Sequence, residues 1–120
     1  MVEFYFKAID ANNNQVVSNT KSTSNTSYVS LGDFVINPTN WLTLTDDSLC
    51  TLELYCKGHY AVGQVMARQK ETPKSDHVVA DEKYDLEIEH EDAQFTKRKE
   101  WQFFKGLKSF EAAILAKEVA

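Results

Sequence analysis

The sequence has few of the residues on which phosphate loops and disulfide scaffolds depend. Of its 120 residues, four are glycine, two are proline and two are cysteine. So little glycine leaves scant material for a phosphate-cradling loop, and the motifs GxGxxG, GxxxxGK[ST], GxSxG and HExxH do not occur. No apolar run approaches the roughly 20 residues of a membrane helix. We therefore expect no catalytic residues, no cofactor and no membrane partner.

The net charge and the N-terminus bear on partners and location. A net charge of −5 makes broad affinity for nucleic acid unfavourable, so we expect no nucleic-acid partner. Residues 1–7 lack the basic start and apolar stretch of a secretory signal, which predicts a cytoplasmic protein. A chain of 120 residues that is 42% hydrophobic has the size and composition of one globular domain, residues 1–120.

The two cysteines predict a strand rather than a disulfide. Cys50, Leu52, Leu54 and Cys56 alternate with polar residues, which is the period of a half-buried strand. Six residues of strand separate Cys50 from Cys56 by about 20 Å, whereas a disulfide needs Cα atoms within about 7 Å. We expect two reduced thiols that pack in the core.

Similar alternation predicts most of the remaining sheet. Strands are expected at residues 2–8, 41–45, 59–67 and 84–91, with an ordered segment over residues 28–36. Fourteen of the residues from 10 to 30 are Asn, Gln, Ser or Thr, which predicts a long loop or an exposed ribbon around Val16-Val17.

Two glycines carry further expectations. Lys57-Gly58 predicts a tight hairpin that sets Tyr55 opposite Tyr60, and Gly63 indicates a bulge or a close contact.

The C-terminal segment has the spacing of an amphipathic helix. Phe103, Leu107, Phe110 and Ile114 recur at intervals of four, three and four, and neighbouring alanines favour helix, with a start near Leu107. Residues 95–104 are interpreted as a strand beside residues 84–91, although one long helix from Asp92 interrupted at Gly106 is a competing interpretation. The predicted fold is α+β, a mainly antiparallel sheet of six to seven strands with one C-terminal helix packed on it.

The strictest alternation of the chain carries a concentrated negative charge. Tyr84, Leu86, Ile88 and His90 fall on one face of a strand, and Asp85, Glu87, Glu89 and Glu91 fall on the other. Because His90 and Glu89 lie on opposite faces, they cannot ligate one ion, and we expect no metal site. Residues 76–92 hold eight acids against one lysine, and Lys97-Arg98-Lys99 follows shortly after.

Two explanations of this acidic block are open. Lys97, Arg98 and Lys99 on an adjacent strand would neutralise it across a hairpin. Otherwise the block faces outward and binds a basic surface of a protein partner. In the second case the protein is a non-catalytic intracellular interaction module, such as an inhibitor or immunity-type factor. The partner-binding residues are then Asp85, Glu87, Glu89, Glu91 and Asp92.

Two further hypotheses follow from other features. The alternative function is a small-ligand-binding or minor enzymatic domain, with an aromatic pocket between sheet and helix lined by Tyr60, Trp101, Phe103 and Phe110. Self-association as a homo-oligomer through an exposed strand edge is the third hypothesis.

Overall fold

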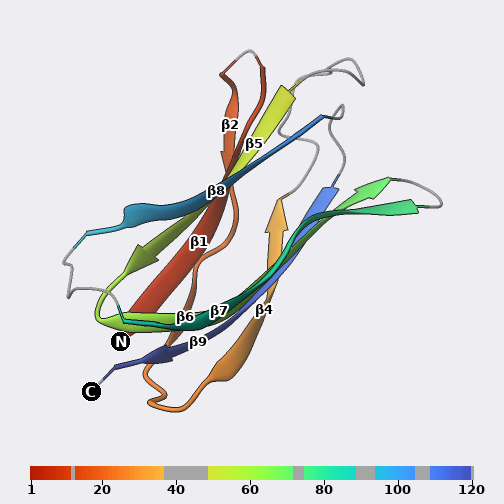
Figure 1. Cartoon of the computed structure of the whole chain (residues 1–120). Coiled ribbons are helices and arrows are strands. Elements are labelled where there is room, and N and C mark those ends of the chain that lie inside the picture. Colours follow the sequence, from red (N-terminus) through yellow and green to blue (C-terminus); the bar gives the residue numbers. More distant parts are fainter. Residues whose placement is uncertain (12, 37–48, 72–74, 89–93, 105–108, 120) are drawn as a thin grey trace.

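The computed structural model describes residues 1–11, 13–36, 49–71, 75–88, 94–104 and 109–119. Within these ranges the chain forms strands and no helix (Figure 1). The strands are β1 (Val2–Ile9), β2 (Gln15–Val17), β3 (Lys21–Thr23), β4 (Val29–Ile36), β5 (Leu49–Lys57), β6 (Tyr60–Glu71), β7 (Ser75–Ile88), β8 (Thr96–Phe104) and β9 (Ser109–Glu118). The predicted strand at residues 41–45 lies outside the described residues.

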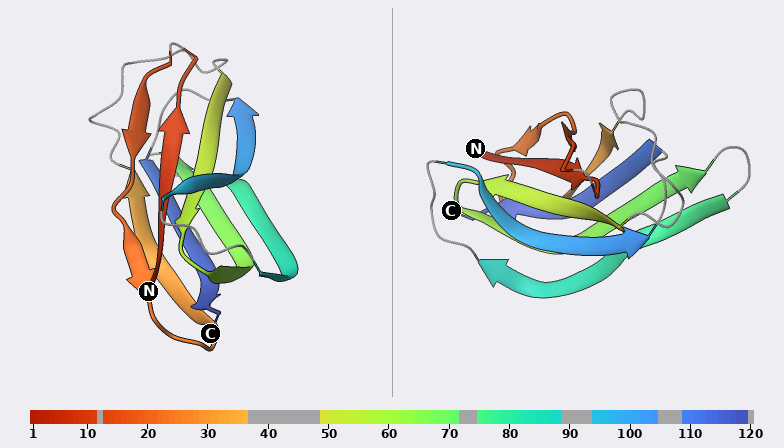
Figure 2. Two further views of the ribbon diagram at one scale, coloured as in Figure 1. Left: turned by 90° about the vertical axis from the view of Figure 1, so that its left-hand side faces the viewer. Right: turned by 90° about the horizontal axis from the view of Figure 1, so that it is seen from above.

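The strands form two antiparallel sheets that pack as a β-sandwich. Sheet A has the order β2-β1-β5-β8, with β3 also paired to β1, and sheet B has the order β4-β9-β6-β7. Figure 2 shows one sheet lying over the other. Each sheet therefore has an inner face that contributes to the core and an outer face.

The core is built by alternation along the central strands. Every second residue of β1, from Val2 to Ala8, is buried, and the same holds for β5 from Cys50 to Cys56, which confirms both predicted strands. Aromatic rings from the two sheets meet edge to face. The centroids of Phe4 and Tyr60 are 5.7 Å apart, and those of Phe6 and Phe34 are 5.1 Å apart. Each such buried side chain stabilises the fold by roughly 1.5–3 kcal/mol.

The predicted C-terminal helix, and with it the α+β fold, was wrong. Residues 109–118 form β9, a central strand that pairs with β4 on one side and β6 on the other. Phe110, Ile114 and Ala116 are buried. Positions four apart share a face of a strand as well as a face of a helix, so the Phe110–Ile114 spacing is common to both structures. The alanines favour helix only weakly, and pairing on both sides overrides that preference.

The predicted hairpin at Lys57-Gly58 was also wrong, because β5 and β6 belong to different sheets. Tyr55 lies opposite Tyr5 of β1 and not opposite Tyr60. Gly58 has φ +99° and takes the chain from sheet A to sheet B. A glycine with positive φ can form a tight turn, and it can equally lead the chain from one sheet to the other. The Lys57-Gly58 sequence therefore could not distinguish a hairpin from a change of sheet.

The polar tract forms the ribbon expected around Val16-Val17 and closes one side of the sandwich. β2 and β3 pair with successive halves of β1. Between them, the Asn19 side chain donates to the carbonyl of Asp33 and accepts from the amide of Val35, each at 3.0 Å. This amide group satisfies two backbone groups of the edge strand β4 and ties it to the ribbon.

The bulge expected at Gly63 is confirmed. The register of β6 shifts between Val62 and Gln64 against both of its neighbours. A Cβ atom at Gly63 would lie 3.2 Å from the Tyr28 ring, so the glycine also permits a close approach.

We predict that Gly58→Ala destabilises the protein by about 1–3 kcal/mol, because an L side chain is strained at this positive φ. Its Cβ would also lie 3.0 Å from the backbone oxygen of Met1. Gly32→Ala is the matched control, since no atom lies within 4 Å of a Cβ placed there. Urea unfolding of both variants measures the difference, and equal midpoints would contradict the role given to Gly58.

Candidate functional site

The acidic block lies on the edge strand of sheet B. β7 is extended over Ser75–Ile88 and pairs with β6, which confirms the strand predicted over its described part. Asp85 and Glu87 belong to β7, but their side chains are not among those that the structure describes. Glu89, Glu91 and Asp92 lie outside the described residues. The acidic face predicted for these five residues therefore stays a prediction.

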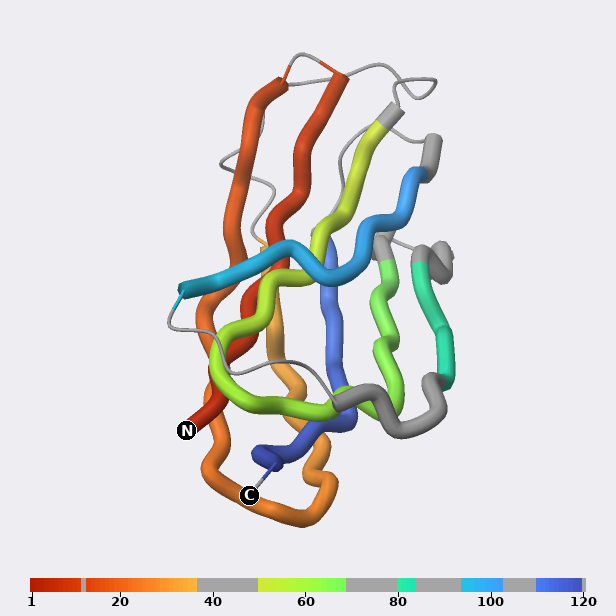
Figure 3. Tube along the Cα trace, turned by 60° about the vertical axis from the view of Figure 1, so that its left-hand side comes forward, coloured from red at the N-terminus to blue at the C-terminus, as the bar shows by residue number. Residues whose placement is uncertain are grey.

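The pairing that would have neutralised this block across a hairpin was wrong. β8, which contains Lys97, Arg98 and Lys99, pairs with β5 in sheet A and not with β7 (Figure 3). The strand predicted at residues 95–104 is thus confirmed as β8 (Thr96–Phe104), but it has a different neighbour. After β7 the chain crosses from sheet B to sheet A. The order of the strands in the sequence does not reveal this change of sheet.

Lys97 forms ion pairs within sheet A. Its Nζ atom lies 3.1 Å from Oε2 of Glu100 and 3.3 Å from Oε2 of Glu53. The hydrogen bonds that Lys97 donates to these two carboxylates, first to Glu100 and then to Glu53, raise the pKa of Lys97. The cation therefore stays charged and engaged on the outer face of sheet A.

The acidic side chains of β7 that the structure describes accept hydrogen bonds from neutral groups. Oδ1 of Asp81 accepts from Nε2 of Gln64 at 3.2 Å. Oε1 of Glu82 accepts from the Trp101 indole at 3.1 Å, and this bond links β7 to β8 across the two sheets. Both donors are neutral groups, and both bonds orient the carboxylates.

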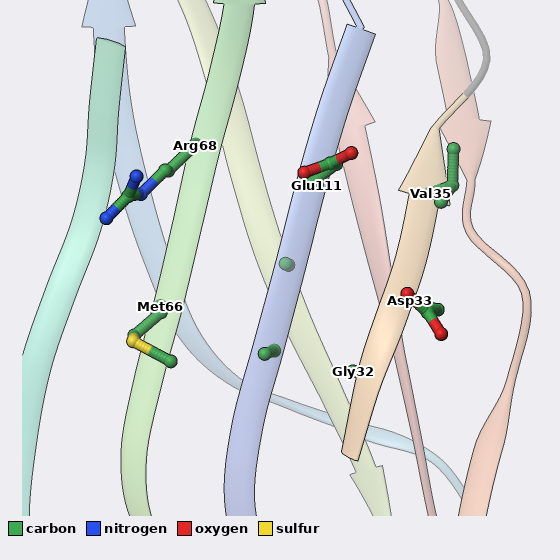
Figure 4. Close-up of a pocket in the computed structure, with 8 residues that line it drawn as sticks. Gly32, Asp33, Val35, Met66, Arg68 and Glu111 are labelled. Atoms are coloured by element: carbon green, nitrogen blue, oxygen red, sulfur yellow. The ribbon is translucent and has the colours of Figure 1, made fainter. Parts of the chain in front are cut away.

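A hollow of about 380 Å³ lies on the outer face of sheet B, here called the sheet-B groove. Its lining consists of Gly32, Asp33 and Val35 of β4, Met66 and Arg68 of β6, and residues 111–113 of β9. Figure 4 shows Met66 and Arg68 on one side of β9 and Asp33 and Val35 on the other. Ala113 of β9, which lies opposite Met66, presents a small side chain to this face and leaves the middle of the groove low between two taller walls.

The walls of the sheet-B groove expose apolar surface. Val35 is 48% exposed and Met66 is 39% exposed, and they are two of the four large hydrophobic residues that are exposed in the described part of the chain. Val65 and Ala67, on either side of Met66, are fully buried. Strand alternation therefore places Met66 on the outer face, and this alternation alone explains its exposure.

The strand register joins this groove to the acidic edge. Ala113 of β9 lies opposite Met66 of β6, and Met66 lies opposite Asp81 of β7. Residues opposite each other in a sheet share a face and lie about 5 Å apart. The first described carboxylate of the acidic strand thus sits immediately beside the apolar wall of the groove.

The row of residues next to Ala113 and Met66 consists of Val35, Glu111 and Arg68, and it carries charge of both signs. Glu111 of β9 lies opposite Val35 of β4 and opposite Arg68 of β6. Asp33 lies on the rim, Asp81 lies beside Met66, and the exposed Lys83 lies two residues from Asp81 on β7, so the described part of this surface holds three carboxylates and two cations. Asp33 has φ +60°, so a backbone bulge presents this rim residue.

The aromatic residues predicted to line a ligand pocket do not lie against a helix. Tyr60, Trp101 and Phe110 are buried in the core between the sheets, and the side chain of Phe103 is not described. The pocket between sheet and helix was wrong, because β9 takes the place of the helix. The sheet-B groove was not predicted from the sequence. The available signal was that Met66 and Arg68 fall on the exposed face of the alternating strand β6.

The outer face of sheet A is a packed aromatic and ionic cluster. The Tyr5 and Tyr55 rings stack at 4.9 Å, and Phe95 meets Tyr5 edge to face at 4.8 Å. Lys7 lies over the Tyr55 ring at 4.8 Å. Burial, the largest cause, raises the pKa of Tyr5 and keeps it a neutral phenol. These rings already contact each other and a cation, so we assign the cluster to stability.

The described residues contain no group of three His, Cys, Asp or Glu side chains placed to hold a metal ion. Nor does the described part of the chain include a helix long and apolar enough to cross a membrane. Cys50 and Cys56 are buried, as predicted, and no disulfide joins them. Burial, with a smaller contribution from the nearby Asp10 carboxylate, raises the pKa of Cys50 to about 11.

Comparison with known proteins adds no relative. No family model, no curated protein and no solved structure matches this chain. The function is therefore argued from the geometry of sheet B.

We predict that Cys50 of the folded protein is alkylated by iodoacetamide at pH 8 at least about a hundredfold more slowly than in urea. Raising its pKa from 9.0 to about 11 lowers the reactive thiolate by about that factor, and burial slows access further. The Cys56→Ser variant isolates Cys50, and mass spectrometry follows the reaction. Similar rates in the folded and unfolded protein would contradict the buried placement.

Proposed function

We propose that this protein is a non-catalytic interaction module that binds a basic surface of a protein partner through the outer face of sheet B. The binding surface comprises the acidic strand β7 and the sheet-B groove beside it. The observation that carries the proposal is the register that places Asp81 next to Met66, because it puts charge and apolar surface on one continuous face.

The charge of β7 supports a basic partner. Its sequence holds Asp76, Asp81, Glu82, Asp85 and Glu87 against Lys83. An edge strand with this composition attracts a basic surface and accelerates association at low ionic strength. Pairing of two β7 edges would instead set acids against acids, which disfavours self-association through this edge.

The apolar part of the same face supports specific binding. Charge at the rim of an interface chiefly sets the association rate and the choice of partner, whereas affinity comes from a few desolvated anchors. Met66 supplies exposed apolar area next to the acidic strand, and Val35 supplies it on β4, at the far side of the sheet-B groove. Methionine also adapts its shape to a partner side chain.

We predict that neutralising β7 with Asp81→Asn, Asp85→Asn and Glu87→Gln lowers partner capture at least about tenfold while the fold is retained. Proteins retained by the immobilised wild type and variant are compared by quantitative mass spectrometry, at low and high salt. Circular dichroism and thermal unfolding check the fold.

The matched control is Val17→Lys, Ser22→Lys and Gln102→Lys. All three positions are exposed and lie in sheet A, and the change in net charge is the same. The proposal expects this control to retain the wild-type partner. Equal capture by the neutralised variant, or equal loss with the control, would show that the acidic strand is not the binding surface.

A further inference from the structure

We infer that the backbone edge of β4 that faces away from β9 is a self-association surface, and that the side chain of Asn19 keeps it closed. The occupant we commit to is β4 of a second copy of this chain, paired antiparallel. This edge is distinct from the outer face of sheet B, so its role does not depend on the proposed partner.

The Asn19 side chain takes the place of a neighbouring strand. β4 lies at one end of sheet B and pairs there with β9, so its other backbone edge is turned away from the sheet. At that edge the Asn19 carboxamide donates to the carbonyl of Asp33 and accepts from the amide of Val35. A strand added to this edge needs the same carbonyl and amide, and it has to displace Asn19 to reach them.

Ser18 holds Asn19 in this position. The Oγ atom of Ser18 accepts from the amide of Phe6 at 2.9 Å and donates to the carbonyl of Asn19 at 2.8 Å. The amide of Ser18 donates to the carbonyl of Phe6 at 2.8 Å, and Ser18 is buried. Asn19 is therefore anchored to β1 of sheet A while its side chain covers the edge of sheet B.

The composition of β4 suits pairing with itself. Only one of its eight residues, Asp33, is charged, and Val35 is 48% exposed. An apolar edge strand with little charge is the kind of edge at which chains associate. Two β4 strands bring one carboxylate each, and a register that does not set the two Asp33 residues opposite each other avoids direct repulsion.

The other edge strands of the described sheets have different safeguards. β7 holds five acids against one lysine, and β8 holds Lys97, Arg98 and Lys99 against Glu100. β2 and β3 have three residues each. Charge of one sign and short length both discourage pairing at an edge. β4 is longer than β2 and β3 and carries a single charge, so the carboxamide of Asn19 supplies the protection.

Sedimentation velocity at rising protein concentration compares the wild type with Asn19→Ala. The variant opens the carbonyl of Asp33 and the amide of Val35 in each copy. We expect it to dimerise with a dissociation constant at least about tenfold lower than that of the wild type. Equal dissociation constants would overturn the inference.

The matched control is Asn25→Ala, which is expected to behave as the wild type. Asn25 is also exposed, and it bonds to Thr23 and Glu118 through its backbone amide and carbonyl, which the substitution keeps. Dimerisation of this control as strong as that of Asn19→Ala would show that Asn19 has no special role. Circular dichroism checks that each variant is folded.

Two further variants separate an opened edge from a general loss of stability. Asn19→Asp loses the donor to the Asp33 carbonyl but places a charge at the edge, so it is expected to stay monomeric. Adding Val35→Pro to Asn19→Ala removes the amide that points away from β9, and it is expected to restore the wild-type dissociation constant. Association of either variant as strong as that of Asn19→Ala would overturn the role of the β4 edge.

The amide of Val35 reports where the second copy binds. In dilute Asn19→Ala its hydrogen exchange is expected to be at least about tenfold faster than in the wild type, because its acceptor is gone. At concentrations at which the dimer predominates, the same amide is expected to regain its protection. A dimer in which this amide stays unprotected would place the contact elsewhere and contradict the inference.

Discussion

The fold depends on the packing of side chains between two sheets that are stacked face to face. Phe4 and Phe6 of β1 reach across to Tyr60 and Phe34 of sheet B, and Ile114 of β9 closes the core from that side. Side-chain hydrogen bonds then fasten the two long sides of the sandwich. Asn19 bonds to β4 on one side, and Glu82 bonds to Trp101 on the other. Because alternate residues are committed to the core, the remaining residues of each strand are left on the outer faces, where function can be placed.

The outer faces of the two sheets differ in how far their side chains already contact one another. On sheet A, Tyr5 and Tyr55 stack, and Lys97 is held between Glu53 and Glu100. On sheet B, the small Ala113 lies in the middle of β9, and Met66 and Val35 on the neighbouring strands expose apolar surface. This contrast between a packed face and a hollowed face is the structural reason for placing the interaction surface on sheet B.

The sequence predicted individual strands far better than their neighbours. Strict alternation located β1 and β5, since a period of two is incompatible with a helix. It failed at β9, where the interval from Phe110 to Ile114 suits either structure. The predicted pairing of β6 with β5 and of β8 with β7 was wrong because the chain changes sheet between β5 and β6 and again between β7 and β8. The acidic strand was visible as composition, whereas the sheet-B groove was not, because β4, β9 and β6 are distant in sequence.

The central claim is that a partner docks on the outer face of sheet B. Backbone hydrogen exchange, measured on the free protein and on its complex with the captured partner, tests it most directly. The account predicts added protection in β7 and in the segments around Asp33 and Met66, with β1 and β5 unchanged. Added protection confined to β1, β5 and β8 would place the partner on sheet A and contradict the account.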